Sequence, residues 1–69
     1  MKEINDILTK YGYTIYEVQS RQRNTRLVNC KVEIARMLRD KGYSYPVIGK
    51  VLNKDHTTIM HYIKKHKKI

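Results

Sequence analysis

The 69-residue sequence predicts a single all-helical domain of about five helices that includes a helix-turn-helix. Apolar residues recur along the chain at the three- and four-residue spacings of amphipathic helices. Capping residues and glycines divide these stretches from one another. Between residues 44 and 66, two short helical stretches are joined by a tight turn, which is the helix-turn-helix pattern. A chain of this length has room for one small core, which must be aliphatic and tyrosine-based because Phe and Trp are absent.

The N-terminal part of the sequence predicts two helices that form a packing layer. The first helix carries apolar residues at positions i, i+3, i+4 and i+7, which are Ile4, Ile7, Leu8 and Tyr11. Gly12 follows and can adopt the left-handed backbone that ends a helix. Thr14 and Glu17 have the spacing of a capping box, so they predict the start of a short second helix anchored by Ile15 and Val18.

A polar, basic connection with the sequence SRQRNTR spans residues 20–26. Asn24 or Thr25 can cap the helix that follows, because their side-chain oxygens accept from free amide groups at a helix start. This third helix is predicted from about residue 26 to 41 and ends at Gly42.

The third helix has one broad apolar face, formed by Leu27, Cys30, Ile34, Ala35, Met37 and Leu38. Cys30 is the only cysteine, which excludes an internal disulfide, and its place on this face makes it a small core residue. Lys31 lies at the edge of the face, where its stem can pack while its ammonium group reaches solvent.

The helix-turn-helix begins with a predicted cap at Ser44 and with Pro46 in the first turn, where proline is tolerated. The apolar stripe of this helix consists of Val47, Ile48, Val51 and Leu52. Asn53 and Lys54 form the turn, because Asn tolerates the left-handed backbone that ends a helix. Asp55 is then the predicted N-cap of the last helix.

The last helix separates apolar residues from polar and basic ones. Ile59, Met60 and Ile63 cluster on one side. The opposite side carries Thr57, Thr58, His61, Lys64 and Lys65. Asp55 and His56 stand at the leading tip, where a recognition helix presents its first residues to base edges. This arrangement favours contact with a ligand through the polar side.

Charge is distributed unevenly along the chain. The formal net charge is +9, and residues 1–19 contribute −1 while residues 20–69 contribute +10. A strongly basic segment indicates an anionic partner. Nucleic acid is the first candidate for that partner, and an anionic membrane surface is the second.

Residues 46–49 read Pro-x-Ile-Gly, and the run Asp55-His56-Thr57-Thr58-Ile59 is followed by His61. These motifs resemble the C-terminal DNA-binding domain of the bacterial replication initiator DnaA, and the resemblance covers about residues 4–66. The resemblance implies a domain that binds double-stranded DNA sequence-specifically as a monomer, with the last helix in the major groove. It also implies a role in replication or transcription at sites like DnaA boxes. The resemblance further implies a protein that acts in the cytoplasm of a bacterium and is encoded by the bacterium or by a phage.

The resemblance and the chemistry together indicate the contact residues. The expected base contacts are Arg23 in the minor groove and Asp55, His56 and Thr57 in the major groove. The expected phosphate contacts are Lys31, Lys50, Lys54, Thr58, His61 and Lys64. An aspartate accepts from the amino group of cytosine, and a threonine methyl can meet the thymine methyl. For Arg23 the alternative is a solvated loop residue, and for Lys31 the register of the match to the family allows a shift by one residue.

Other classes of function fit the sequence less well. His56, His61 and His66 are five residues apart, so neighbours point about 140° from each other on a helix and cannot share a metal ion. The three glycines lack the spacing of a nucleotide-binding loop, so neither a nucleotide nor an ATPase module is expected. No nucleophile accompanies the histidines, and no apolar run reaches the roughly 18 residues of a membrane span. We therefore expect no catalysis, cofactor or membrane insertion.

The alternative from a different class is a protein-interaction module that docks an acidic partner through the same basic helices. Residues 55–58 discriminate between the two, because a docking module has no need of base-reading groups at a helix tip. We further expect residues 1–69 to form one domain and the chain to be a natural stand-alone protein, since Met1 and the first helix resemble a natural start; the alternative is a domain excised from a larger initiator.

Overall fold

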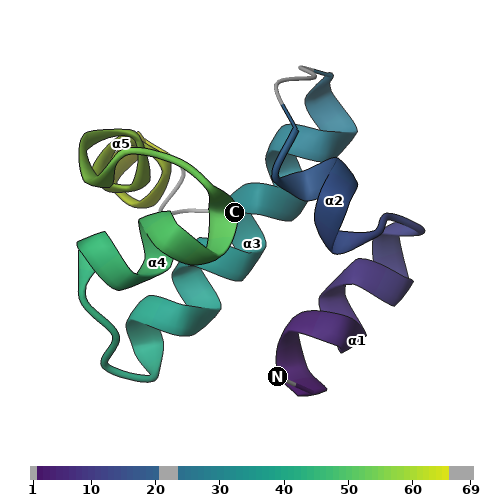
Figure 1. Ribbon diagram of the computed structural model, residues 1–69, viewed down its shortest axis with the longest axis horizontal. Coiled ribbons are helices and arrows are strands. Elements are labelled where there is room, and N and C mark those ends of the chain that lie inside the picture. The colour runs from purple at the N-terminus through teal and green to yellow at the C-terminus, as the bar shows by residue number, and fades with distance from the viewer. Residues whose placement is uncertain (1, 21–23, 66–69) are drawn as a thin grey trace.

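The computed structural model describes residues 2–20 and 24–65 (Figure 1). Within these residues it contains five α-helices and no strand, which confirms the predicted all-helical fold. The helices are α1 (Lys2–Tyr11), α2 (Ile15–Val18), α3 (Thr25–Asp40), α4 (Tyr45–Leu52) and α5 (His56–Lys65).

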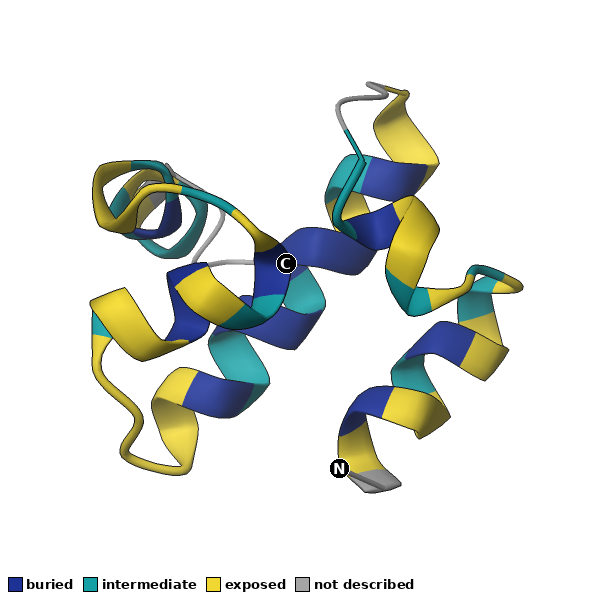
Figure 2. Cartoon of the chain, viewed as in Figure 1, coloured by how far each residue is buried: buried dark blue, intermediate teal, exposed yellow. Residues whose placement is uncertain are grey.

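Helix α3 is the centre of the domain, and it contacts each of the other four helices. Figure 1 shows α1 and α2 on one side of α3, and α4 and α5 on the other. Figure 2 shows the buried residues concentrated along α3 and on the sides of the other helices that face it. The helix-turn-helix formed by α4 and α5 is therefore one half of the molecule, and it packs against α3.

The apolar face predicted for α3 is confirmed, because Leu27, Cys30, Ile34, Ala35 and Leu38 are all fully buried and Met37 is partly buried. Val32 is also fully buried, although it lies outside the predicted face. The reason is that α3 is covered from two sides, so more than one stripe of its surface is removed from water. Burial of this apolar surface is the main stabilising contribution to the fold.

The helix ends follow the predicted capping chemistry. Gly12 and Gly42 have φ angles of 77° and 95°, the left-handed conformation expected after α1 and α3. The capping box is formed, because Glu17 N donates to Thr14 Oγ1 at 3.2 Å and Thr14 N donates to Glu17 Oε1 at 2.9 Å. Asn24 caps α3 by accepting from the amide of the third helical residue at 2.8 Å, so α3 begins one residue earlier than predicted.

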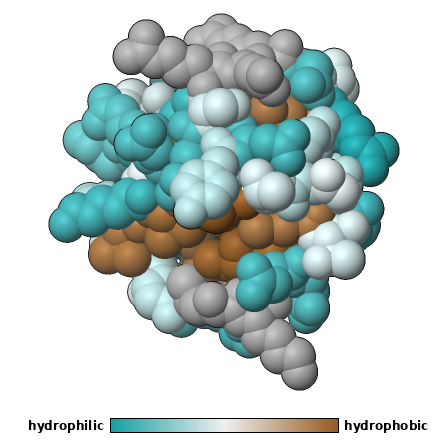
Figure 3. Space-filling view, turned by 45° about the vertical axis from the view of Figure 1, so that its right-hand side comes forward, coloured by the Kyte–Doolittle hydropathy of each residue, from teal (hydrophilic) through white to brown (hydrophobic). Residues whose placement is uncertain are grey.

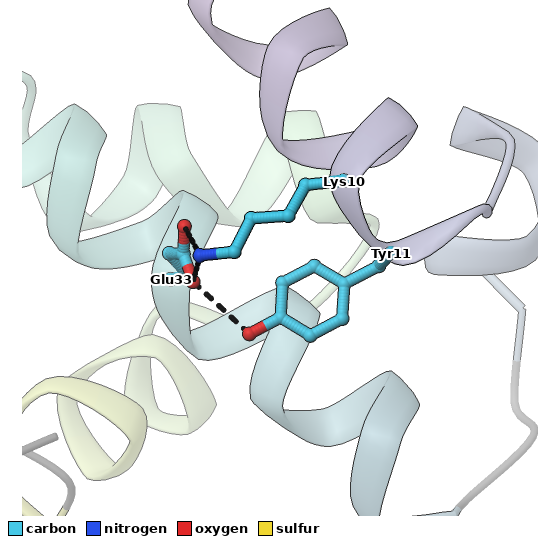
Figure 4. Close-up of polar contacts among 3 residues, drawn as sticks. All are labelled: Lys10, Tyr11 and Glu33. Atoms are coloured by element: carbon cyan, nitrogen blue, oxygen red, sulfur yellow. Dashed lines mark hydrogen bonds and ion pairs between the residues drawn. The ribbon is translucent and has the colours of Figure 1, made fainter.

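Polar contacts fasten the end of α1 to α3 (Figure 4). Lys10 Nζ lies 3.2 Å from both carboxylate oxygens of Glu33, and the Tyr11 hydroxyl donates to Glu33 Oε1 at 3.0 Å. Arg26 donates from Nη2 to the Tyr11 carbonyl at 2.6 Å, which satisfies a free acceptor at the end of α1. Burial is the main cause that raises the pKa of Tyr11, and the hydrogen bond to Glu33 raises it further.

The start of α4 differs from the prediction in two respects. Ser44 precedes the helix, but its side chain makes no capping hydrogen bond. Pro46 occupies the second helical position and has no N–H, so one of the two usual donors to a capping side chain is missing. Val47 is 43% exposed, whereas Ile48 and Leu52 are fully buried, so the apolar stripe of α4 is narrower than predicted.

The structure confirms the turn predicted between α4 and α5. Asn53 has a φ of 55° and a ψ of 46°, which is the left-handed conformation. Lys54 N then donates to the Gly49 carbonyl at 2.7 Å. Gly49 is buried, and a Cβ atom at this position would collide with the Lys54 carbonyl oxygen. Glycine at position 49 therefore provides the space that the tight turn requires.

The face shown in Figure 3 is mostly hydrophilic, with a band of hydrophobic residues across it. Several hydrophobic residues pack against the core while remaining partly exposed: Ile7, Ile15, Met37, Val51 and Ile63. A domain of this size has too little volume to cover its core completely.

Candidate nucleic-acid interface

The residues predicted to contact bases in the major groove lie together at the leading end of α5. Asp55 directly precedes the helix, and its carbonyl accepts from Ile59 N at 3.2 Å. Asp55, His56 and Thr57 are all exposed, while Ile59 on the opposite side of the helix is fully buried. The buried side fixes the orientation of α5 and leaves these three polar side chains at its tip accessible.

Asp55 and His56 also contact each other. Asp55 Oδ1 lies 3.3 Å from His56 Nδ1, and the two side chains are 72% and 58% exposed. Both belong to the lining of an open hollow of about 450 Å³ beside the turn, together with Lys50 and Lys54. The structure thus brings two of the predicted phosphate contacts next to two of the predicted base contacts.

Lys31 differs from the prediction, because its side chain is only 2% exposed and its ammonium does not extend into solvent. Helix α5 packs against α3, and its Thr58 and Tyr62 line a cavity together with Lys31. The ammonium remains hydrogen-bonded, since Lys31 Nζ donates to the Ser20 carbonyl at 3.3 Å. A lysine can be buried in this way because its charged group keeps a polar partner.

Lys54 reaches the same carbonyl. Its Nζ lies 3.4 Å from the Ser20 oxygen, and the side chain is half-buried. Lys31, Lys54 and Thr58 line a cavity of about 350 Å³ between α3 and α5, with Val28 and Tyr62. Three of the six predicted phosphate contacts therefore lie around one cavity that holds two positive charges.

The remaining predicted contacts are placed differently. His61 and Lys64 are exposed further along α5 and do not line either of these two hollows. Arg23, the predicted minor-groove residue, lies outside the described residues.

Two residues that the sequence did not single out connect α2 to the helix-turn-helix. Gln19 Nε2 donates to the Val51 carbonyl at 2.8 Å, and the Ser20 carbonyl accepts from both lysines. Gln19 and Val51 are 32 residues apart in the sequence, and Ser20 and Lys54 are 34 residues apart. No local pattern in the sequence signals such a contact, because it depends on how the helices pack.

The architecture and the site together define a helix-turn-helix domain, in which a supporting helix and a short helix hold an exposed, polar recognition helix. A family model described as the bacterial DnaA protein helix-turn-helix matches residues 2–65. The chain belongs to this family, as its resemblance predicted. Membership implies a non-catalytic module that binds double-stranded DNA. No curated protein and no solved structure gave a match.

Within the described ranges, no helix combines the length and the apolar composition that crossing a membrane requires.

Proposed function

We propose that this protein binds double-stranded DNA sequence-specifically as a monomer and regulates replication or transcription at sites that resemble DnaA boxes. In this proposal it acts in the cytoplasm of a bacterium, encoded by the host or by a phage. The observation that carries the proposal is the cluster of exposed Asp55, His56 and Thr57 at the tip of α5. These groups are suited to base edges and have no role in the core.

Helix α5 is the proposed reader of the major groove, which is about 12 Å wide and admits one α-helix. Asp55 accepts from a cytosine amino group, and the Thr57 methyl contacts a thymine methyl. His56 stands between them at the first position of the helix. Arg23 is proposed to enter the adjacent minor groove, where arginine is attracted by the negative potential.

The cavity lined by Lys31, Lys54 and Thr58 is the proposed seat of one backbone phosphate. In the free protein the two ammonium groups share a neutral carbonyl, that of Ser20. A phosphate oxygen is a stronger acceptor, because its hydrogen bond to an ammonium is charge-assisted. Thr58 adds a hydroxyl donor in the same cavity.

Three exposed residues complete the proposed contacts to the backbone. Lys50 lines the hollow beside the turn, and His61 and Lys64 lie along α5. Contacts of this kind raise affinity for every duplex equally and carry no sequence information.

The test is selection of duplexes from a random library with the purified protein, followed by binding measurements on the selected site at several salt concentrations. We expect a preferred sequence and an affinity that falls steeply with salt, because counterions are released from the phosphates. No binding to any duplex at low salt would overturn the proposal and favour the alternative of an acidic protein partner.

A pair of variants separates the two kinds of contact. Lys64→Ala removes a proposed phosphate contact, so it is expected to weaken all duplexes about equally and to lower the salt slope by about one. Asp55→Asn keeps the size of the exposed side chain but adds donors, so it is expected to retain the melting temperature and lose discrimination at one base pair. Equal discrimination by Asp55→Asn and the wild type would reject a base contact by this carboxylate.

A further inference from the structure

The cavity of about 350 Å³ between α3 and α5 has the composition of a binding site for a small anion. Val28 and Lys31 are three residues apart on α3, and Thr58 and Tyr62 are four apart on α5, so each pair occupies one side of its helix. Lys54, in the turn before α5, completes the lining. Two ammonium groups and a threonine hydroxyl can donate to an anion there. Among the described residues that line the cavity, none is acidic.

The two lysines hold their ammonium groups close together. Lys31 Nζ and Lys54 Nζ lie 3.3 and 3.4 Å from the same oxygen, the main-chain carbonyl of Ser20, so both can reach one phosphate group. That carbonyl is neutral and does not cancel their charges. Two like charges at short range repel each other, most strongly where one of them is buried, as Lys31 is. An anion between them replaces this repulsion with attraction.

The charge and the size of the cavity both fit a ligand other than the DNA backbone. A backbone phosphate carries one negative charge, whereas a phosphomonoester carries about −1.5 to −2 at neutral pH. The monoester is therefore the better match for two ammonium groups. The cavity also has more room than one phosphate group requires, and its volume lies in the range of roughly 300–1,000 Å³ that is usual for small-molecule pockets. Val28 and Tyr62 provide an apolar wall for the organic group of such an ester.

We propose that this cavity also takes a small organic phosphomonoester as a dianion, and that such a ligand competes with DNA for the protein. The phosphate group lies between Lys31 and Lys54 in place of the Ser20 carbonyl and accepts from the Thr58 hydroxyl. Binding of the ester stands independently of DNA. The competition rests on the proposed function, in which the same cavity seats a backbone phosphate.

Phenyl phosphate is the probe for the site, and phenyl sulfate is its matched control, because the two have the same shape but the sulfate ester carries a single negative charge. Binding is measured by two-dimensional NMR titration of the purified protein at constant ionic strength and about pH 7.5, where the monoester is mostly a dianion. We expect the signals of Thr58 and Tyr62 to shift. Phenyl phosphate is expected to bind at least about tenfold more tightly than phenyl sulfate, as expected for one hydrogen bond to a charged group. Equal affinities, or no binding of phenyl phosphate, would overturn the proposal.

Two lysine variants locate the charge that binds the ester. Lys54→Met removes one ammonium group of the cavity, so it is expected to weaken phenyl phosphate at least about tenfold. The matched control is Lys10→Met, which removes the same charge from α1, where the side chain is 64% exposed and paired with Glu33. It is expected to change the affinity by no more than about twofold, because exposed distant charges are screened. A folded Lys54→Met protein that binds phenyl phosphate as tightly as the wild type would overturn the site.

A third variant keeps the test decisive if Lys54→Met does not fold. Thr58→Val keeps the shape of the side chain and removes only its hydroxyl, so it is expected to weaken phenyl phosphate by roughly 3- to 10-fold. Unchanged affinity in a folded Thr58→Val protein would contradict the proposed contact.

Inorganic phosphate supplies the same dianion without an organic group. It is expected to bind several-fold more weakly than phenyl phosphate, because it buries no apolar surface against Val28 and Tyr62. Equal affinity for the two would overturn the assignment of the ligand to an organic ester.

Competition is measured by fluorescence anisotropy of the selected duplex at constant ionic strength. Phenyl phosphate at about nine times its own Kd is expected to raise the apparent Kd for DNA about tenfold, as mass action requires for exclusive binding. An unchanged Kd for DNA would overturn the competition. If phenyl phosphate does not bind but the duplex does, the inference fails and the proposed function stands. If no duplex binds, the proposed function fails, and the NMR titration alone decides whether the cavity takes the ester.

Discussion

Replacing Gly49 with alanine tests whether the tight packing of α4 against the turn holds the recognition helix in place. An added Cβ atom would collide with the main-chain carbonyl oxygen of Lys54, and the Lys54 and Asp55 carbonyl carbons lie 3.5 and 3.6 Å from it. These are backbone atoms, so no side-chain rotation can relieve the overlap. The turn cannot easily retreat either, since Lys54 N is hydrogen-bonded to the Gly49 carbonyl at 2.7 Å.

Two effects of opposite sign decide how much Gly49→Ala changes the free energy of unfolding. Alanine in place of glycine inside a helix ordinarily stabilises by about 0.5–1 kcal/mol. Overpacking a well-packed site costs about 1–3 kcal/mol, and the upper part of that range applies where the backbone has to move. The net expectation for Gly49→Ala is a loss of about 1–2 kcal/mol. For a domain of this size that corresponds to a fall in Tm of roughly 4–16 °C.

The assay is thermal and urea unfolding followed by far-UV circular dichroism. Lys50→Ala is the matched control, because it changes the neighbouring, exposed position of the same helix. It is expected to alter stability by no more than about 0.5 kcal/mol. A Gly49→Ala protein that melts at or above the wild-type temperature would show that the turn has room for a methyl group and would refute the argument.

Three further predictions concern the core and its polar contacts. Lys31→Met keeps the buried stem and removes the charge, so we expect unchanged or higher stability in urea unfolding together with weaker duplex binding. Tyr11→Phe removes the hydroxyl bond to Glu33 and is expected to cost about 0.5–1.5 kcal/mol in the same assay. Burial raises the pKa of Cys30 to about 11, so the folded state holds this proton more tightly than the unfolded state. Stability is therefore expected to fall as pH rises above about 9 towards 11, and less steeply in Cys30→Ala, measured by unfolding at each pH.

Features that depend on neighbours in the sequence were predicted well. The glycine ends of α1 and α3, the capping box at Thr14 and the left-handed Asn53 all follow from residue types at fixed local spacing. Such features need no knowledge of tertiary packing, because the hydrogen bonds involved close within a few residues. The order and number of the helices followed from the same local signals.

Features that depend on what packs against a helix were not predictable in the same way. The sequence places Val47 and Ile48 together on one stripe, yet only Ile48 is buried. Lys31 was expected at the edge of a face with its ammonium in solvent, but the residue is buried. Periodicity defines which side of a helix is apolar, whereas the width of the buried surface depends on the number of helices around it.

The contacts around Ser20 show how the free protein prepares the interface that we propose. Gln19 is bonded to the Val51 carbonyl, and Lys31 and Lys54 are bonded to the Ser20 carbonyl, so the end of α2 is held against the helix-turn-helix. Ordering a long lysine side chain on binding costs about 0.5–1.5 kcal/mol. Because both ammonium groups are already held at one cavity by a neutral acceptor, a phosphate can replace that acceptor without paying the full ordering cost twice. In this proposal, the burial of Lys31 holds its ammonium group in place for a phosphate before DNA binds.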